Sequence, residues 1–324
     1  MFGRDTLDVE ADQVNTESPA IDALDRRIID LLQHDGRQSY QALSEAIGLS
    51  RPATRARLLR LLDTRILEIK GVVHPTVFGL HSYAHASIKI VGSAEVVAES
   101  LVSEVDIPFV SITAGNHALV AELRCRDQST LTEILGWIKA IPQVQSVQAS
   151  VYATIVKDAY WPPRPFLGSE LAPADIHLLE LLQHDGRSSY VELAERTQLS
   201  PTAVRTRMAR LLSTGVLHIG ARIRPDVMGS SHIFGFGLTV QGNTTPVIDL
   251  LRPLDAVQYL AATLGRHDVV GTATAPSIAE MLTILEQIRA IDGVYDLEVW
   301  THLRFVKEDY DRWPINGQCT TEPN

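Results

Sequence analysis

The sequence is poor in cysteine, with only Cys125 and Cys319 in a chain of 324 residues. Structural metal sites and disulfide frameworks need several cysteines at short spacings, so we expect neither here. Long apolar runs are missing too, and none approaches the roughly 20 residues that cross a bilayer. The acidic first residues lack the apolar segment of a signal peptide. These absences predict a soluble, cytoplasmic protein with no membrane partner.

Positive charge is also scarce, since 29 lysines and arginines stand against 39 acidic residues and the net charge is −10. That sum argues against nucleic-acid binding, but the distribution of charge matters more than its total. Residues 51–65 hold several arginines against one acid, Asp63, and residues 201–215 hold arginines and no acid. These arginines are Arg51, Arg55, Arg57, Arg60, Arg65, Arg205, Arg207 and Arg210. The chain is therefore acidic as a whole and basic along two short segments.

A repeat organises the rest of the chain. The heptapeptide Leu-Leu-Gln-His-Asp-Gly-Arg at residues 31–37 returns unchanged at residues 181–187, an offset of 150. The same offset still relates Gly115 to Gly265 far downstream. A long period that holds its register indicates a duplicated unit of two domains. The chain length suits two to four domains.

The first part of each unit has the pattern of three short helices. Apolar spacing predicts a helix over residues 20–34, and Ser39 and Ser50 can cap two more, the last at about 51–64. Branched residues at 66–73 favour a strand or wing. Three helices with a glycine-containing bend between the second and third form a helix-turn-helix. We therefore expect winged helix-turn-helix domains at residues 20–74 and 174–224.

The second part of each unit alternates between strands and helices. In the first copy we expect strands at residues 82–91, 110–113, 119–125 and 144–156, and helices at residues 94–105 and 128–140. In the second copy we expect the helices at residues 246–254 and 277–290. The order βαββαβ is that of a ferredoxin-like domain, with two helices on one face of an antiparallel sheet. The other face needs a second sheet as cover, from the other repeat or from another chain.

These patterns predict ferredoxin-like domains at residues 75–158 and 225–310. Three segments fall outside the four domains. We expect residues 1–19 to be a disordered lead and residues 311–324 a disordered tail. The proline-rich residues 159–173 suit an extended linker between the two units.

The segment from Asp35 to Leu43, Asp-Gly-Arg-Gln-Ser-Tyr-Gln-Ala-Leu, and its copy from Asp185 each precede Leu-Ser and an arginine-bearing helix. This pattern resembles the Lrp/AsnC family of transcription regulators, over nearly all of residues 21–158 and 171–308. The resemblance implies an α+β fold in which each winged helix-turn-helix domain is followed by a ferredoxin-like domain for effector binding and oligomerisation. Family members are usually single units that pair into dimers, and this chain resembles two fused units.

The resemblance also implies a surface for double-stranded DNA. The third helix of each unit would enter the major groove and meet base edges near its N-terminus. The start of the second helix would hold a phosphate, although its tyrosine equally suits packing between helices. Arg57 and Arg207 would bind phosphate or brace the first helix. The implied DNA contacts are Ser39, Tyr40, Ser50, Arg51, Thr54, Arg55, Arg57, Ser189, Tyr190, Ser200, Thr202, Arg205 and Arg207.

The family's effector site lies near a Gly-x-x-Asp turn between the second and third strands of the ferredoxin-like domain. The second unit keeps this motif and the first has alanine in place of the acid. The resemblance therefore implies unequal binding of an amino acid-like effector by the two units. The alternative is a tight turn that simply needs glycine. The implied effector residues are Gly115, Asn116, His117, Gly265, Arg266, His267 and Asp268.

Two departures bear on how the units behave. Arg65 stands where the second unit has Gly215, and a left-handed backbone at Arg65 would cost roughly 1 kcal/mol. The N-terminal ends of the third helices also differ, Arg-Pro-Ala-Thr at residues 51–54 against Pro-Thr-Ala-Val at residues 201–204. Because the two helices should prefer different half-sites, we predict an imperfect palindrome as the DNA site.

Three functions compete at this stage. The first is a DNA-binding regulator tuned by a small metabolite, and another is a ligand-binding scaffold that has lost DNA contact. The remaining one is an enzyme, because a branch of similar architecture acts as siroheme decarboxylase. Its candidate residues here are His117, His267, His302, Arg266 and Arg304.

Sequence motifs for catalysis do not support the enzyme. The spacings of a Ser-His-Asp triad, a phosphate-binding loop, a dinucleotide site and a zinc site are all missing. We therefore predict no catalytic residues, no metal and no cofactor. The basic third helix retained in both units favours a non-enzymatic regulator that binds double-stranded DNA as a homodimer or a larger homo-oligomer.

Overall fold

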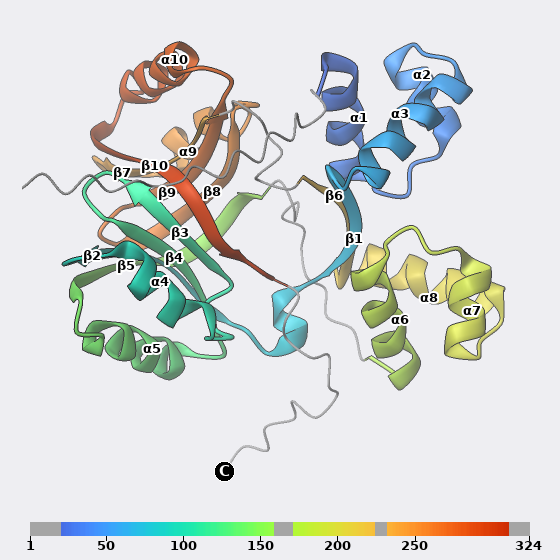
Figure 1. Ribbon diagram of the computed structural model, residues 1–324, viewed down its shortest axis with the longest axis horizontal. Helices are drawn as coiled ribbons and strands as arrows, with labels where there is room; N and C mark the ends of the chain where they lie inside the picture. The colour runs from blue at the N-terminus through green and yellow to red at the C-terminus, as the bar shows by residue number, and fades with distance from the viewer. Residues whose placement is uncertain (1–20, 159–170, 224–231, 311–324) are drawn as a thin grey trace, which may run out of the picture.

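The structure is a computed structural model that describes residues 21–158, 171–223 and 232–310. The expected lead and tail lie outside the described residues, and so do residues 159–170 of the expected linker. The linker ends earlier than expected, because a helix already begins at Pro173. Figure 1 shows two layers, with helix-turn-helix units on one side and a β-barrel with its helices on the other.

Each unit begins with three helices, as the apolar spacing predicts. They are α1 (Ala23–His34), α2 (Tyr40–Ile47) and α3 (Arg51–Asp63) in the first unit, and α6 (Pro173–His184), α7 (Tyr190–Thr197) and α8 (Pro201–Ser213) in the second. The hydroxyl of Ser39 accepts a hydrogen bond from the Ala42 amide, and that of Ser50 accepts one from the Ala53 amide. The bend after α2 is the left-handed Gly48, with a φ of 71°. The predicted helix-turn-helix is thus confirmed in both copies.

The strand expected after each third helix forms, but it is not a wing folded against its own unit. Strand β1 (Leu67–Val73) pairs with β6 (Leu217–Ile223) of the second unit, antiparallel and centred on Lys70 opposite Gly220. The two triplets of helices share one hydrophobic core with this ribbon, which includes Ile28 and Leu182. The two helix-turn-helix units are therefore joined into one body within the chain.

The ferredoxin-like order βαββαβ is also confirmed in both copies. The first copy comprises β2 (Ser82–Ile90), α4 (Ala94–Val102), β3 (Phe109–Ala114), β4 (Leu119–Cys125), α5 (Gln128–Ala140) and β5 (Val144–Asp158). A short 3-10 helix, η1 (Pro75–Phe78), precedes it. The second copy comprises β7 (His232–Val240), α9 (Thr245–Leu251), β8 (Val257–Gly265), β9 (Val269–Ala275), α10 (Ile278–Arg289) and β10 (Val294–Glu308). Helices α4 and α9 end three residues before their expected bounds.

The second sheet that was expected as cover comes from the other repeat of the same chain. The two sheets join at both edges, β3 with β10 and β5 with β8, to give a closed barrel in the order β10-β3-β4-β2-β5-β8-β9-β7. The helices pack on the outer faces around two separate apolar cores, one containing Leu101 and the other Leu251. The inner faces of both sheets therefore enclose one shared interior.

Two further properties bear on the sequence expectations. Within the described ranges, no helix combines the length and apolar character needed to cross a membrane. Cys125 is a buried free thiol, and burial raises its pKa to about 12. A thiol with so high a pKa is not poised for nucleophilic chemistry.

Candidate functional site

The N-terminal ends of α3 and α8 carry the side chains expected to contact DNA bases. Arg51 and Arg55 on α3 are exposed, and so are Thr202 and Arg205 on α8. Thr54 is different, because it is fully buried and its hydroxyl donates to the Ser50 carbonyl at 3.1 Å. The expected base contact by Thr54 is therefore corrected, since its side chain packs inward between the helices.

The serines at the helix starts are occupied as caps. The hydroxyls of Ser50 and Ser200 accept hydrogen bonds from the amides three residues further on, at Ala53 and Ala203. Ser39 and Ser189 do the same at the start of α2 and α7. All four remain exposed, so each could still meet a phosphate through its remaining hydrogen-bonding capacity.

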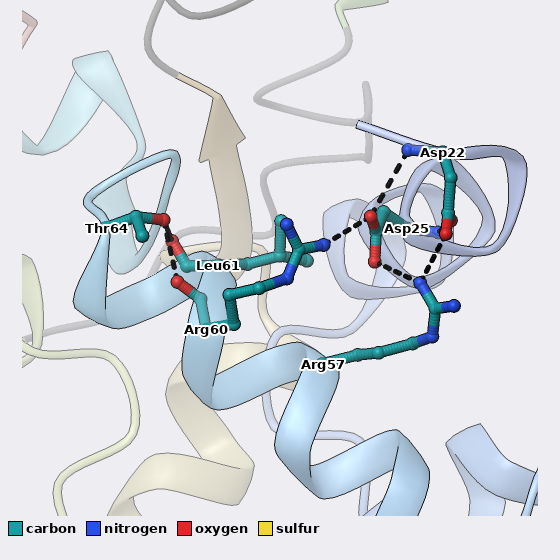
Figure 2. Close-up of polar contacts among 6 residues, drawn as sticks. All are labelled: Asp22, Asp25, Arg57, Arg60, Leu61 and Thr64. Carbon is teal, nitrogen blue, oxygen red and sulfur yellow. Dashed lines mark hydrogen bonds and ion pairs between the residues drawn. The ribbon is translucent and has the colours of Figure 1, made fainter. Parts of the chain in front are cut away.

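Arg57 braces the first helix, one of the two roles expected for it. Its guanidinium lies 2.6 Å from the Asp22 carboxylate and 2.9 Å from that of Asp25, at the start of α1 (Figure 2). Arg60, one turn further along α3, pairs with the other oxygen of Asp25. Asp25 is fully buried, so its charge depends on these two guanidinium groups.

The second unit repeats this brace with Asp175. Arg207 and Arg210 lie 2.9 and 2.6 Å from its two oxygens. Burial acts to raise the pKa of Asp175, but the hydrogen bonds from Arg207, the Ala172 amide and Arg210 outweigh it and lower that pKa. Two of the basic residues counted along each third helix thus hold α1 or α6 in place. The exposed arginines left are Arg51 and Arg55 on α3 and Arg205 on α8, with Arg65 exposed just beyond the end of α3.

The repeated Asp-Gly-Arg motif holds the two helix-turn-helix units together. The amide of Gly36 donates to the Ile219 carbonyl at 2.8 Å, and that of Gly186 donates to the Ile69 carbonyl at 2.9 Å. Arg37 reaches across to the Gly186 carbonyl at 2.8 Å, and Arg187 reaches to the Gln38 carbonyl at 3.2 Å. We call this reciprocal set, residues 36–38 and 186–187 with the β1–β6 ribbon, the clasp.

Tyr40 and Tyr190 take part in the clasp through their ring faces. The Arg187 guanidinium lies 5.4 Å from the centre of the Tyr40 ring, and that of Arg37 lies 5.1 Å from the Tyr190 ring. Arg205 of the same unit also lies 5.1 Å from the Tyr190 ring. The structure thus supplies the packing role for both tyrosines, with cation–π contacts to the opposite unit. Their phosphate contact stays a prediction.

The two expected effector turns meet at one carboxylate that sequence reasoning missed, Glu298 on β10. Asn116 and His117 of the first turn lie 3.2 and 3.3 Å from one oxygen of Glu298. Arg266 and His267 of the second turn lie 2.5 and 2.8 Å from the other oxygen. Burial acts to raise the pKa of Glu298, but the hydrogen bonds from His267, Arg266 and Asn116 lower it to about 2. The carboxylate is therefore ionised and already satisfied by the protein.

The turn glycines and Asp268 have structural tasks. Gly115 and Gly265 hold φ angles of 151° and 133°, which favour glycine. Asp268 accepts from the Val240 amide at 2.8 Å, so its carboxylate braces β7. In this structure, the aspartate of the Gly-x-x-Asp turn in the second unit thus braces a strand, and the first unit has alanine at that position. The signal for Glu298 was present in the repeat, because the position 150 residues earlier is Gln148, which meets His117 at 3.1 Å.

The residues considered for an enzyme have different partners. His117, His267 and Arg266 surround Glu298. His302 instead bonds Ser111 at 2.9 Å, and Arg304 is exposed and pairs with Glu95 on α4. Among the described residues, no group of three or more His, Cys, Asp and Glu side chains is arranged to hold a metal ion.

Comparisons with known proteins agree with this geometry. The model of the AsnC-type helix-turn-helix domain matches residues 21–62 and 174–212, so it matches twice. The model of the PF0864 C-terminal dimeric alpha+beta barrel domain matches residues 92–162.

Curated relatives match one unit's length of this chain. The HTH-type transcriptional regulator FL11 of Pyrococcus abyssi is 28% identical over 134 residues, 41% of this chain and 89% of that protein. An uncharacterized HTH-type transcriptional regulator of the same organism is 31% identical over 132 residues, 40% of this chain and 84% of its own length. The proline dehydrogenase transcriptional activator of Rhizobium radiobacter is 28% identical over 144 residues, which cover 43% of this chain and 92% of that protein.

A solved structure matches the whole architecture. The siroheme decarboxylase NirDL aligns with a TM-score of 0.62 over 90% of this chain and 96% of its own, at 14% sequence identity. At that identity the match shows a shared fold of two units in one chain. It says nothing of shared chemistry.

Proposed function

The chain belongs to the Lrp/AsnC family of transcriptional regulators, and we propose that it is a regulator in which one polypeptide does the work of a family dimer on DNA. The resemblance describes members as single units that pair. Here the clasp joins two helix-turn-helix units, and the closed barrel joins two ferredoxin-like domains. One chain then presents two recognition helices, α3 and α8, in a fixed relation.

The observation that carries the proposal is the exposed arginine at the N-terminal end of both third helices. Arg55 and Arg205 occupy equivalent positions and both are exposed. Their neighbours Arg57 and Arg207 form ion pairs with Asp25 and Asp175. In a chain of net charge −10, an exposed guanidinium retained at the groove-entering end of both helices suits contacts with phosphates and base edges.

A mobility-shift titration on the DNA upstream of the protein's own gene tests the proposal. Replacing Arg55 and Arg205 together by alanine should weaken binding by tenfold or more, since each lost contact costs roughly 1–3 kcal/mol. The matched control is Arg126→Ala, because Arg126 is an exposed arginine that follows β4 on the barrel. Equal affinity of the double variant and the wild type would refute the assignment of these helices.

We further propose that effector binding near the two turns is unequal. One carboxylate, Glu298, serves both turns, and its counterpart is the uncharged Gln148. An effector ammonium group that bound Glu298 would have to displace a contact from Arg266 or a histidine, and the Gln148 position offers no carboxylate. Isothermal titration calorimetry with a panel of amino acids should give one site per chain. Two equal sites per chain would contradict this, and association into larger homo-oligomers stays a prediction.

A siroheme decarboxylase-like activity is the second candidate, because NirDL shares the arrangement of two units in one chain. Absorbance spectroscopy of the purified protein separates the two functions. A regulator should show no Soret band and should not convert added siroheme. A stoichiometric Soret band together with release of carbon dioxide would establish the enzyme.

A further inference from the structure

The closed barrel contains a cavity of about 170 Å³ that the regulatory assignment has not used. Aromatic side chains from both repeats line one part of it, among them Phe109, Trp300 and Phe305. The cavity extends to the helix-turn-helix layer, where Gln33 of α1 and Val72 of β1 contribute to its wall. It therefore connects the barrel interior to the ribbon that joins the two DNA-binding units.

Four polar atoms in the cavity wall are buried and have no hydrogen-bond partner. They are Nε2 of His85, Nε2 of His302, Nε1 of Trp300 and the hydroxyl oxygen of Tyr259. His85 is 8% exposed and Trp300 is 4% exposed, and their rings stack with centroids 5.0 Å apart. Buried polar groups are almost always paired, because an unpaired one loses its bonds to water. Unpaired groups that converge on one cavity indicate a missing hydrogen-bonding partner there.

The surroundings of His302 fix which proton it carries. The Ser111 hydroxyl donates to the Arg304 carbonyl at 3.0 Å, so it accepts from Nδ1 of His302 at 2.9 Å. Burial lowers the pKa of His302 to about 4, and the ring is neutral at pH 7. Nε2 therefore presents a lone pair to the cavity. Trp300 presents the opposite group, an N–H that can only donate.

The charged part of the cavity wall carries no excess of positive charge. Two guanidinium groups, of Arg124 and Arg222, stand beside three carboxyl groups, of Glu122, Asp158 and Glu308. Arg124 pairs with Glu122 at 2.6 Å. A carboxylate ligand entering this space would lose its hydration without gaining an uncommitted cation, and burial of such a charge is costly.

The cavity is built by differences between the repeats. His85 in the first copy corresponds to Gly235 in the second, and a Cβ at Gly235 would lie 2.1 Å from the Trp300 ring. The wall residue Glu122 corresponds to Thr272. A dimer of identical units would repeat each feature twice about its axis. This interior has one Trp300, one unpaired His302 and thus room for one orientation of a ligand.

We propose that the barrel interior is a binding site for one uncharged, planar aromatic molecule per chain that carries both a hydrogen-bond donor and an acceptor. Its donor meets Nε2 of His302, its acceptor meets Nε1–H of Trp300, and its ring packs among Phe109 and Phe305. Because the cavity reaches α1 and β1, occupancy acts on the ribbon that spaces α3 and α8. The proposal deepens the regulatory function, on which it rests for its purpose, and is distinct from the turns at Glu298.

Isothermal titration calorimetry with three uncharged probes, 2-quinolone, 1-isoquinolinone and 4-hydroxybenzamide, tests the site on the full chain. At least one probe should bind with one site per chain. The anionic 2-naphthoate should bind at least tenfold more weakly than that probe. Trp300→Phe and His302→Phe should each weaken the bound probe by roughly fivefold, the usual effect of losing one neutral hydrogen bond.

Filling the cavity supplies the decisive control. Thr272→Trp should abolish probe binding, with Thr274→Met as a second filling variant if the first does not fold, as judged by its melting temperature. The site is refuted if none of the three probes gives saturable heat, if filling leaves their affinity unchanged, or if 2-naphthoate binds as tightly. A mobility shift on the same preparations separates the two proposals, because lost DNA binding with intact probe binding refutes only the regulator.

Discussion

Arg65 holds a left-handed backbone conformation, with a φ of 54°, at the end of α3. Its counterpart after α8 is Gly215, with a φ of 73°. The same turn is thus needed in both units, and one of them makes it with a residue that carries a Cβ. The steric cost of roughly 1 kcal/mol expected for a left-handed Arg65 therefore applies, because both units have this left-handed backbone.

Arg65→Gly should therefore stabilise the protein by roughly 0.5–1 kcal/mol, since glycine reaches this conformation without a steric penalty. Urea denaturation followed by circular dichroism measures the change. Gly48→Ala is the reciprocal control, because Gly48 holds a φ of 71° with nothing within 4 Å of a new Cβ. It should destabilise by a similar amount through backbone strain alone. A less stable Arg65→Gly variant would show that the side chain has a task there.

His302 makes stability depend on pH. Its pKa falls from 6.5 to about 4 on burial, so the folded state resists a proton that the unfolded chain accepts. Stability is fully present above pH 6.5 and is lost as the pH falls towards 4.

Between pH 7 and pH 5 this group alone should remove about 2 kcal/mol from the free energy of unfolding. His302→Gln should abolish that share, while the difference between variant and wild type at pH 8 sets the baseline. Denaturation midpoints across the pH range measure it. Parallel pH profiles for the two proteins would show that His302 takes up its proton without opposing the fold.

The clasp depends on the absence of a side chain at two positions. A Cβ at Gly36 would lie 3.0 Å from the Ile219 carbonyl oxygen of the opposite unit, and one at Gly186 would lie 3.1 Å from the Ile69 carbonyl oxygen of the opposite unit. The glycine of the repeated Asp-Gly-Arg motif is thus required by close contact with the opposite unit. A helix stop alone would not require it at this spacing.

Gly36→Ala and Gly186→Ala should each lower the free energy of unfolding by about 1–3 kcal/mol, the usual cost of overpacking. The matched control is Gly136→Ala in the exposed face of α5, where a Cβ meets nothing within 4 Å. That change should be neutral or stabilising by up to about 1 kcal/mol, because alanine is the better helix former. If all three variants melted alike, the clasp would carry no stability.

The local sequence pattern predicts the positions of helices and strands well, but it predicts poorly which strands pair with each other. Apolar periodicity and serine caps give the positions of α2 and α3 to within a residue or two, because helices depend on near neighbours in sequence. The pairing of β1 with β6 depends on residues 150 apart, so the strand looked like a wing.

The same limit applies to the candidate sites. Counting arginines along α3 overstates the charge offered to DNA, because two of them turn back to the buried Asp25. Both glycine turns form between the strands where they are expected, and their role in effector binding stays a prediction. Their shared partner Glu298 lies on a strand some 30 residues further along and carries no motif of its own. The position of Glu298 could have been found by comparing the repeats, because the first repeat has Gln148 at the equivalent position.

At the scale of the whole molecule, one chain carries two unlike recognition helices in fixed positions. Arg51 and Thr202 stand at or next to the first positions of α3 and α8, where a symmetric dimer would have identical residues. We therefore expect a single chain to bind one imperfect palindrome. Selection from random DNA, with the mass of the complex measured by light scattering, checks both points. Recovery of perfect palindromes, or two chains per site, would contradict them.

The closed barrel bears on whether this chain can exchange subunits with related proteins. Regulators that assemble from separate subunits can trade partners with paralogues and form mixtures with blended specificity. In this chain both edges of each ferredoxin-like sheet are taken up by the other half of the same polypeptide. Exchange of a partner through these sheet edges would require the barrel to open, so we expect this chain not to form mixed barrels with related single-unit proteins.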